Sequence, residues 1–67
     1  MRKFSERLRE LREERGLSQN QLAKQTGFSS TSVSRWENGE ADIASDYLII
    51  LCKFFGVSAD YLLGLED

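Results

Sequence analysis

The sequence predicts an all-α fold, a compact domain of five short helices. The chain contains no proline and no run in which apolar and polar residues alternate, as they do in a half-buried strand. Its five glycines divide the chain into segments of helical length, within which apolar residues recur every three or four positions. At 67 residues the chain has room for a single core, so we expect one domain over residues 1–67.

Capping residues bound each of the five helices. Phe4, Leu8 and Leu11 give the first helix an apolar face, and Gly16 follows where a left-handed cap is favoured. Ser18 precedes the second helix and forms a capping box with the glutamine three positions later. Serines also precede the third and fifth helices, and glycines follow the fourth and fifth. The predicted helices cover about residues 4–15, 19–26, 30–38, 45–55 and 59–63.

The composition argues against several classes of protein. There is no histidine, and the single cysteine, Cys52, lies in an apolar stretch without a base to activate it. We therefore expect no enzyme, no metal site and no cofactor. No apolar run approaches the roughly 20 residues that span a bilayer, and the charged N-terminal segment lacks a secretory signal. These features predict a cytoplasmic protein that has no membrane partner.

Charge is distributed unevenly along the chain. The net charge of −2 alone argues against a nucleic-acid partner. However, residues 1–39 carry eight basic and five acidic side chains, for a net charge of +3, whereas residues 40–67 carry one basic and six acidic side chains, for −5. The first part of the chain can therefore face a polyanion.

The third predicted helix has one polar face and one apolar face. At 100° per residue, Val33 and Trp36 point to the core, and we expect packing for both Trp36 and Phe28 rather than stacking on bases. The opposite face carries Ser30, Thr31, Ser34 and Arg35. Such a helix suits the DNA major groove, where arginine can bind guanine and hydroxyls can contact several base edges. The alternative is that the serines only cap and solvate an exposed helix.

Residues 17–39, LSQNQLAKQTGFSSTSVSRWENG, resemble the helix-turn-helix core of the lambdoid phage repressor and Cro family, also called the xenobiotic-response-element family. The resemblance extends through RLRELREERG before this stretch and LIILCKFFGVSADYLLG after it. It implies a five-helix, lambda-repressor-like DNA-binding domain with the helix-turn-helix at about 18–38. It also implies a bacterial or phage-encoded protein that binds double-stranded DNA at the nucleoid.

The resemblance implies a role for several residues. Arg12 and Glu37 match an arginine–glutamate pair that fixes the angle of the third helix. The base-reading positions are Ser30, Thr31 and Arg35, with Ser34 beside them. The phosphate-binding positions are Gln19 and Asn38, to which we add Ser29 and Lys24. Relatives often carry basic residues in the loop after the third helix, whereas this chain has Glu40 and Asp42. We therefore expect weaker binding with a shallower salt dependence.

The fourth helix carries apolar residues around most of its circumference. Burial on most sides would account for this pattern. The alternative is that the helix forms a homodimer interface, and the resulting dimer would bind a near-palindromic DNA site. The candidate interface residues are Tyr47, Ile50 and Phe54, with Tyr61 and Leu65 from the end of the chain.

The sequence therefore predicts a sequence-specific transcriptional regulator, in the first place a repressor, that acts as a homodimer without a small-molecule ligand. The alternative is a protein-interaction module or an antitoxin-like regulator of the same fold. Such a protein would bind a partner protein through its acidic and apolar C-terminal half.

Overall fold

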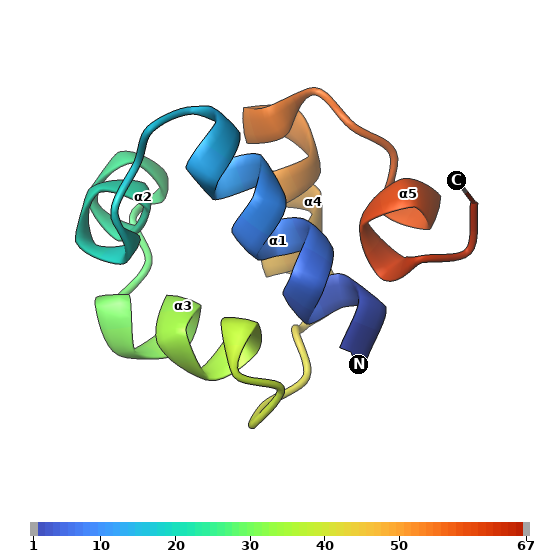
Figure 1. Ribbon diagram of the computed structural model, residues 1–67, viewed down its shortest axis with the longest axis horizontal. Coiled ribbons are helices and arrows are strands. Elements are labelled where there is room, and N and C mark those ends of the chain that lie inside the picture. The colour runs from blue at the N-terminus through green and yellow to red at the C-terminus, as the bar shows by residue number, and fades with distance from the viewer. Residues whose placement is uncertain (1, 67) are drawn as a thin grey trace.

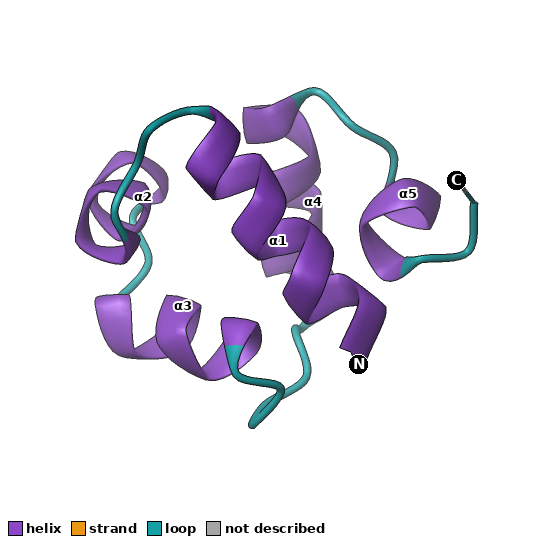
Figure 2. Ribbon diagram, in the orientation of Figure 1, coloured by secondary structure: helices purple, strands orange, loops and turns teal. Residues whose placement is uncertain are grey.

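The computed structural model describes residues 2–66 and is helical, without strands in that range (Figures 1 and 2). The helices are α1 (Arg2–Glu14), α2 (Gln19–Thr26), α3 (Ser30–Glu37), α4 (Ser45–Phe55) and α5 (Ala59–Leu63). Residues 1 and 67, the ends of the predicted domain, lie outside the described residues. The five-helix prediction is confirmed. Of the helices in residues 2–66, none has the length and apolar character that crossing a membrane requires.

Helix boundaries differ from the predicted ones mainly in α1. This helix begins at Arg2 rather than Phe4, because no proline, glycine or capping residue before Phe4 prevents the helix from starting there. It ends at Glu14, and Gly16 adopts the expected left-handed conformation with φ 67°. The third helix ends at Glu37, and Asn38 serves as its C-cap. The remaining bounds agree with the sequence prediction.

Serine side chains start α2, α3 and α5. The Ser18 Oγ accepts a hydrogen bond from the Gln21 backbone N at 3.1 Å, and the Ser18 N donates to Gln21 Oε1 at 2.7 Å, completing the predicted capping box. The Ser29 Oγ accepts from the Ser32 N at 3.1 Å. Between these caps Gly27 takes φ 83°, a conformation that disfavours side chains, so the chain can turn sharply from α2 into α3.

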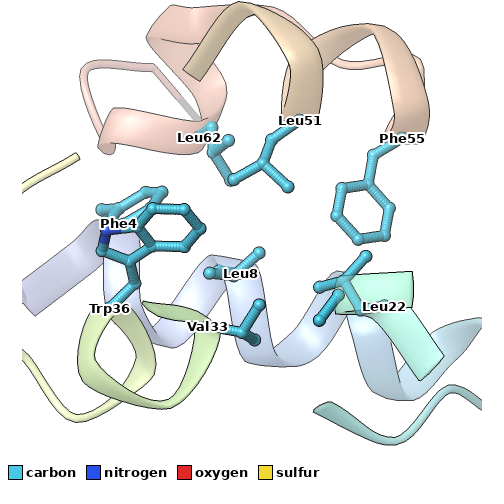
Figure 3. Close-up of a cluster of buried hydrophobic side chains, with 9 residues drawn as sticks. Phe4, Leu8, Leu22, Val33, Trp36, Leu51, Phe55 and Leu62 are labelled. Carbon is cyan, nitrogen blue, oxygen red and sulfur yellow. The ribbon is translucent and has the colours of Figure 1, made fainter. Parts of the chain in front are cut away.

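All five helices contribute to the core. In Figure 3, Leu51, Phe55 and Leu62 point toward Leu8, Val33 and Leu22. The buried apolar residues are Phe4, Leu8, Leu22, Ala23, Val33, Trp36, Leu51, Phe55 and Leu62. Figure 1 shows α1 crossing in front of α4, with α2 and α3 on one side and α5 on the other. Because α3 is anchored to this core, its outer face is held in a fixed position.

Aromatic rings join α3 to α4. Phe28 contacts Trp36 edge to face with ring centroids 5.2 Å apart, and both rings lie against Tyr47, at 5.2 Å and 6.0 Å. The expectation that Phe28 and Trp36 pack within the protein is confirmed.

Candidate nucleic-acid interface

The outer face of α3 is polar and open to solvent. Val33 and Trp36 are 0% and 4% exposed, so they hold the inner face against the core. On the outer face, Ser30, Thr31 and Arg35 are exposed and Ser34 is half-buried. Within residues 2–66 the guanidinium of Arg35 has no ion-pair or hydrogen-bond partner. Its donors are therefore available to an external acceptor.

A shallow groove between the start of α2 and the outer face of α3 brings most of the predicted site together. It is lined by Gln19, Asn20, Ser30, Thr31, Ser34, Arg35 and Glu40. Lys24 lies outside this groove and lines a neighbouring hollow, which shares Asn20 and Ser30 with it. The polar side chains of the first turn of α2 and of the outer face of α3 thus line one continuous surface.

Three predicted phosphate-binding residues, Gln19, Asn38 and Ser29, already have partners within the chain. The Gln19 side chain bonds to Glu37. The Asn38 Nδ2 lies 3.5 Å from Ser34 Oγ and 3.4 Å from Glu40 Oε1, which are long hydrogen bonds that a stronger acceptor could replace. The Ser29 hydroxyl caps α3 and donates to Ser32 Oγ at 2.9 Å. A phosphate contact from Ser29 therefore requires its hydroxyl hydrogen to turn away from Ser32.

Two residues of the groove were missed as site residues by the sequence reasoning. Asn20 directly follows Gln19 in the first turn of α2, and its exposed polar side chain was the available signal. Glu40 was noted only as a departure from basic relatives. It reaches the groove because its backbone N donates to the Arg35 carbonyl at 2.9 Å, which folds the chain back toward α3.

Glu37 is the centre of a buried polar network that joins α1, α2 and α3. Its side chain is fully buried, and Arg12 binds it through two hydrogen bonds, Nε to Oε2 at 2.7 Å and Nη2 to Oε1 at 2.9 Å. The Gln19 Nε2 donates to the same Oε1 at 3.1 Å. Arg12 also donates from Nη1 to the Leu17 carbonyl at 2.8 Å. The carboxylate thus ties the first residue of α2 to the last residue of α3.

These contacts change the pKa of both partners. Burial raises the pKa of Glu37, but the hydrogen bonds from Arg12 and Gln19, with the charges of Arg12 and Arg9, bring it below its ordinary value. The hydrogen bond to Glu37 raises the pKa of Arg12, against the opposing effect of burial. Both groups are therefore charged at neutral pH, and the pair keeps its full electrostatic strength.

Two further bonds fix the C-terminal end of α3 on α1. The Ser5 Oγ donates to the Trp36 carbonyl at 2.6 Å, and the Arg9 Nη2 donates to the Glu37 carbonyl at 3.1 Å. Both carbonyls belong to the last turn of α3, where the helix itself offers no donors. The orientation of α3 is therefore set by α1 at one end and by the turn after Gly27 at the other.

The predicted dimer residues do not form one open stripe. Tyr47, Ile50 and Leu65 are 46%, 40% and 74% exposed. Phe54 and Tyr61 are half-buried: the Arg15 guanidinium lies 5.0 Å from the Phe54 ring centroid, and that of Arg7 lies 4.3 Å from Tyr61. Ile49, which the sequence reasoning did not select, is 54% exposed. The fourth helix is therefore not buried on most sides.

Comparison with known proteins identifies the family. A family model described as "Helix-turn-helix" matches residues 8–62. The chain belongs to this helix-turn-helix family. The expected resemblance to phage repressors and their bacterial relatives is confirmed, and the domain is of the type that transcriptional regulators carry.

Several helix-turn-helix relatives align with nearly all of the chain. It is 41% identical over 64 residues to the "HTH-type transcriptional activator BcrR" of Enterococcus faecalis, a match that covers 96% of this chain and 31% of that protein. It is 38% identical over 64 residues to the "Uncharacterized HTH-type transcriptional regulator YobD" of Bacillus subtilis, covering 96% and 57%. It is 36% identical over 60 residues to "Repressor protein C2" of Salmonella phage P22, covering 90% and 28%. The chain thus spans less than two thirds of each of these relatives.

Proposed function

We propose that residues 1–67 form a single DNA-binding domain of a transcriptional regulator, which reads the major groove with α3. The observation that carries this proposal is the unpartnered Arg35 guanidinium, which lies beside Thr31 on the exposed face of a helix whose other face is buried. A binding face of this kind involves no chemical step. The domain binds chromosomal DNA, which places the protein in the cytoplasm at the nucleoid.

Base contacts come from the outer face of α3. Arg35 is the residue that can bind guanine O6 and N7 with two hydrogen bonds, which contributes about 1–3 kcal/mol of discrimination against other bases. Thr31 and Ser30, at the N-terminal end of α3, contact neighbouring base edges, and Ser34 contributes from the same face. Because these side chains are short, the helix backbone can approach the bases closely.

Phosphate contacts come from both ends of the groove. Gln19 begins α2, and its Nε2 has two hydrogens, of which one binds Glu37 and the other is free for a phosphate oxygen. The backbone amides of the first turn of α2 favour an anion at the same place. Asn38 contributes from beyond the far end, next to Ser34 and Glu40, which line the groove, and Lys24 and Ser29 also contribute from outside it. These contacts fix the position of α3 on the duplex.

A homodimer would present two copies of α3 to the same duplex. Two reading helices about 34 Å apart meet successive major grooves on one face of the DNA, so the operator would be near-palindromic. One relative is named an activator and another a repressor. The act common to both is operator binding, and repression results where the operator overlaps a promoter, which is the outcome we propose for this chain.

Selection from random-sequence duplex DNA at low salt tests the proposal. The chain should enrich a two-fold symmetric site containing guanine in each half, and Arg35→Ala should lose preference at that position. Arg35→Lys is the matched control, because it keeps the positive charge but cannot make the planar two-bond contact. Retention of the same consensus by Arg35→Ala, or enrichment of no sequence by the unsubstituted chain, would contradict the proposal.

A further inference from the structure

The outer face of α4 carries four residues in a symmetric order. Leu51 and Phe55 turn inward to the core. Directly opposite them, Asp46 and Lys53 lie seven residues apart, which places them within about 20° of each other around the helix and about 10 Å apart along it. Ile49 and Ile50 lie midway between the two charges, one on each side of the line that joins them. The order acid, two isoleucines, base is centred between positions 49 and 50.

All four side chains are exposed. Asp46 and Lys53 are exposed, and within residues 2–66 neither has an ion-pair or hydrogen-bond partner. Ile49 and Ile50 are 54% and 40% exposed, and Tyr47, 46% exposed, extends the apolar surface beside them. Tyr47, Ile49 and Ile50 thus form an exposed apolar surface between two charges, which a partner of matching charge order could cover.

We propose that this face binds the same face of a second copy, with the two α4 helices antiparallel about a two-fold axis. An isologous interface needs a surface that is complementary to itself. If the axis passes between positions 49 and 50, Asp46 of each copy lies level with Lys53 of the other, and Ile49 lies level with Ile50. An ion pair between Asp46 of one copy and Lys53 of the other then closes each end of the helix pair, and four isoleucines fill the centre.

The order of the charges also sets the direction of pairing. A parallel arrangement would place Asp46 against Asp46 and Lys53 against Lys53, so like charges would meet at both ends. The antiparallel arrangement also sets the two helix dipoles against each other, with each acidic residue near a helix N-terminus and each basic residue near a C-terminus. Charge order therefore selects a second copy in one orientation as the occupant.

The proposed interface is small, so the dimer should be weak. Helix α4 has 11 residues, about 16 Å of length, whereas stable complexes usually bury at least about 1,200 Å² in total. Binding of two copies to one duplex would raise their effective concentration and tighten the pairing. This pairing rests on the homodimer of the proposed function. Its interface consists of Asp46, Ile49, Ile50 and Lys53, in place of the stripe through Phe54 that the sequence predicted.

Charge exchange in the DNA-free chain tests the pairing, with sedimentation equilibrium over a range of concentrations as the measurement. Asp46→Lys alone, or Lys53→Asp alone, places like charges together at both ends and should raise the dimer dissociation constant about tenfold or more. The double variant Asp46→Lys/Lys53→Asp restores opposite charges and should dimerise like the unsubstituted chain. A mixture of the two single variants should form the heterodimer in preference to either homodimer.

Two controls make the outcome specific. Asp60→Lys makes the same charge change on α5, beside Tyr61, and should leave dimerisation unchanged. Circular dichroism of each variant reports whether it is folded, and because the substituted side chains are exposed we expect native spectra. A monomer at every concentration, equal self-association of all variants, or no heterodimer preference in the mixture would overturn the pairing. The DNA selection with Arg35 variants is scored separately, so failure of the pairing leaves that result interpretable.

Discussion

The two halves of the molecule are held together by different interactions. Helices α1, α2 and α3 converge on the buried carboxylate of Glu37, through Arg12 and Gln19 with defined hydrogen-bond geometry. Helices α4 and α5 join them chiefly through apolar side chains such as Leu51 and Leu62, which are 0% exposed. Arg7 of α1 also donates to the Tyr61 carbonyl of α5 at 2.6 Å. Directional polar bonds thus fix the angle of α3, the proposed DNA-reading helix, whereas nondirectional burial supplies much of the stability.

The largest effect expected is from breaking the polar half. Arg12→Ala leaves the Glu37 carboxylate buried without its main partner, which costs about 3–5 kcal/mol. Since small domains have a total stability of about 5 kcal/mol or slightly more, the variant should be partly or largely unfolded near physiological temperature. Urea unfolding measures the loss, and DNA binding should weaken with it because the α3 angle depends on the same pair.

A second substitution separates geometry from stability. In Arg12→Met/Glu37→Leu, apolar side chains replace both charges, so stability should return at least in part. DNA affinity should stay low, because Gln19 loses the acceptor that orients it. If Arg12→Ala unfolds at the same urea concentration as the unsubstituted chain, the polar network does not stabilise the fold and the contrast between the halves is wrong.

The apolar half is tested by Leu51→Ala. Loss of a fully buried leucine costs about 2–5 kcal/mol, depending on how far the cavity collapses. Leu65→Ala makes the same chemical change at a side chain that is 74% exposed, and should shift stability by no more than about 0.5 kcal/mol. Trp36 fluorescence and circular dichroism should report one common transition, because Trp36 contacts Tyr47 across the two halves. Separate transitions would show that α4 and α5 unfold on their own.

The same contrast explains how far the sequence could predict the structure. Helix positions and the faces of α3 follow from local signals: capping serines, glycines and the spacing of Val33 and Trp36. The contacts of Glu37 with Gln19 and Arg9, and the place of Glu40 in the groove, depend on how helices cross. No local pattern encodes those distances. The Arg12–Glu37 contact was expected only because family resemblance carries tertiary information that periodicity lacks.

The surface of α4 was the least predictable from sequence. The 11 residues of α4 place apolar side chains around most of the helix. This pattern fits either a helix that is buried in the core or one that forms an interface. The Arg15 guanidinium, just after α1, lies over the half-buried Phe54 ring, and that of Arg7 in α1 lies over Tyr61. Long cationic side chains can cover apolar surface in this way, so periodicity alone overestimates the exposed stripe.

A smaller effect is expected from the pH dependence of the polar half. The pKa of Glu37 lies below its ordinary value of 4.5, so the folded state takes up this proton less readily than the unfolded state. The stability contributed by the carboxylate is therefore fully present above that ordinary value and is lost as pH falls through the folded-state pKa. Glu37→Gln removes a charged hydrogen-bond acceptor, at a cost of about 1.5–3 kcal/mol at neutral pH.

Urea unfolding of both chains from about pH 7 to about pH 3 measures this contribution. The difference in stability between the unsubstituted chain and Glu37→Gln should be constant near neutrality and shrink in the acid range. Other carboxylates titrate in both chains, so they cancel in the comparison. A difference that stays the same across the whole range would mean that the pKa of Glu37 is the same in the folded and unfolded states, so that its contacts do not lower it.

The smallest effect concerns affinity rather than folding, and it tests whether the acidic half restrains the DNA face. Glu40 lies in the groove with Arg35 and brings a negative charge to the face proposed to meet phosphates, so we expect a shallow dependence of affinity on salt. Glu40→Lys should steepen the slope of log K against log salt by about 0.9 if the new ammonium neutralises one phosphate of B-DNA. Glu40→Gln, which removes the negative charge but adds no positive one, should raise affinity with little change in slope, because it releases repulsion without adding a phosphate contact. Equal slopes for all three proteins would place position 40 away from the bound phosphates, and the acidic residues after α3 would then have no part in setting affinity.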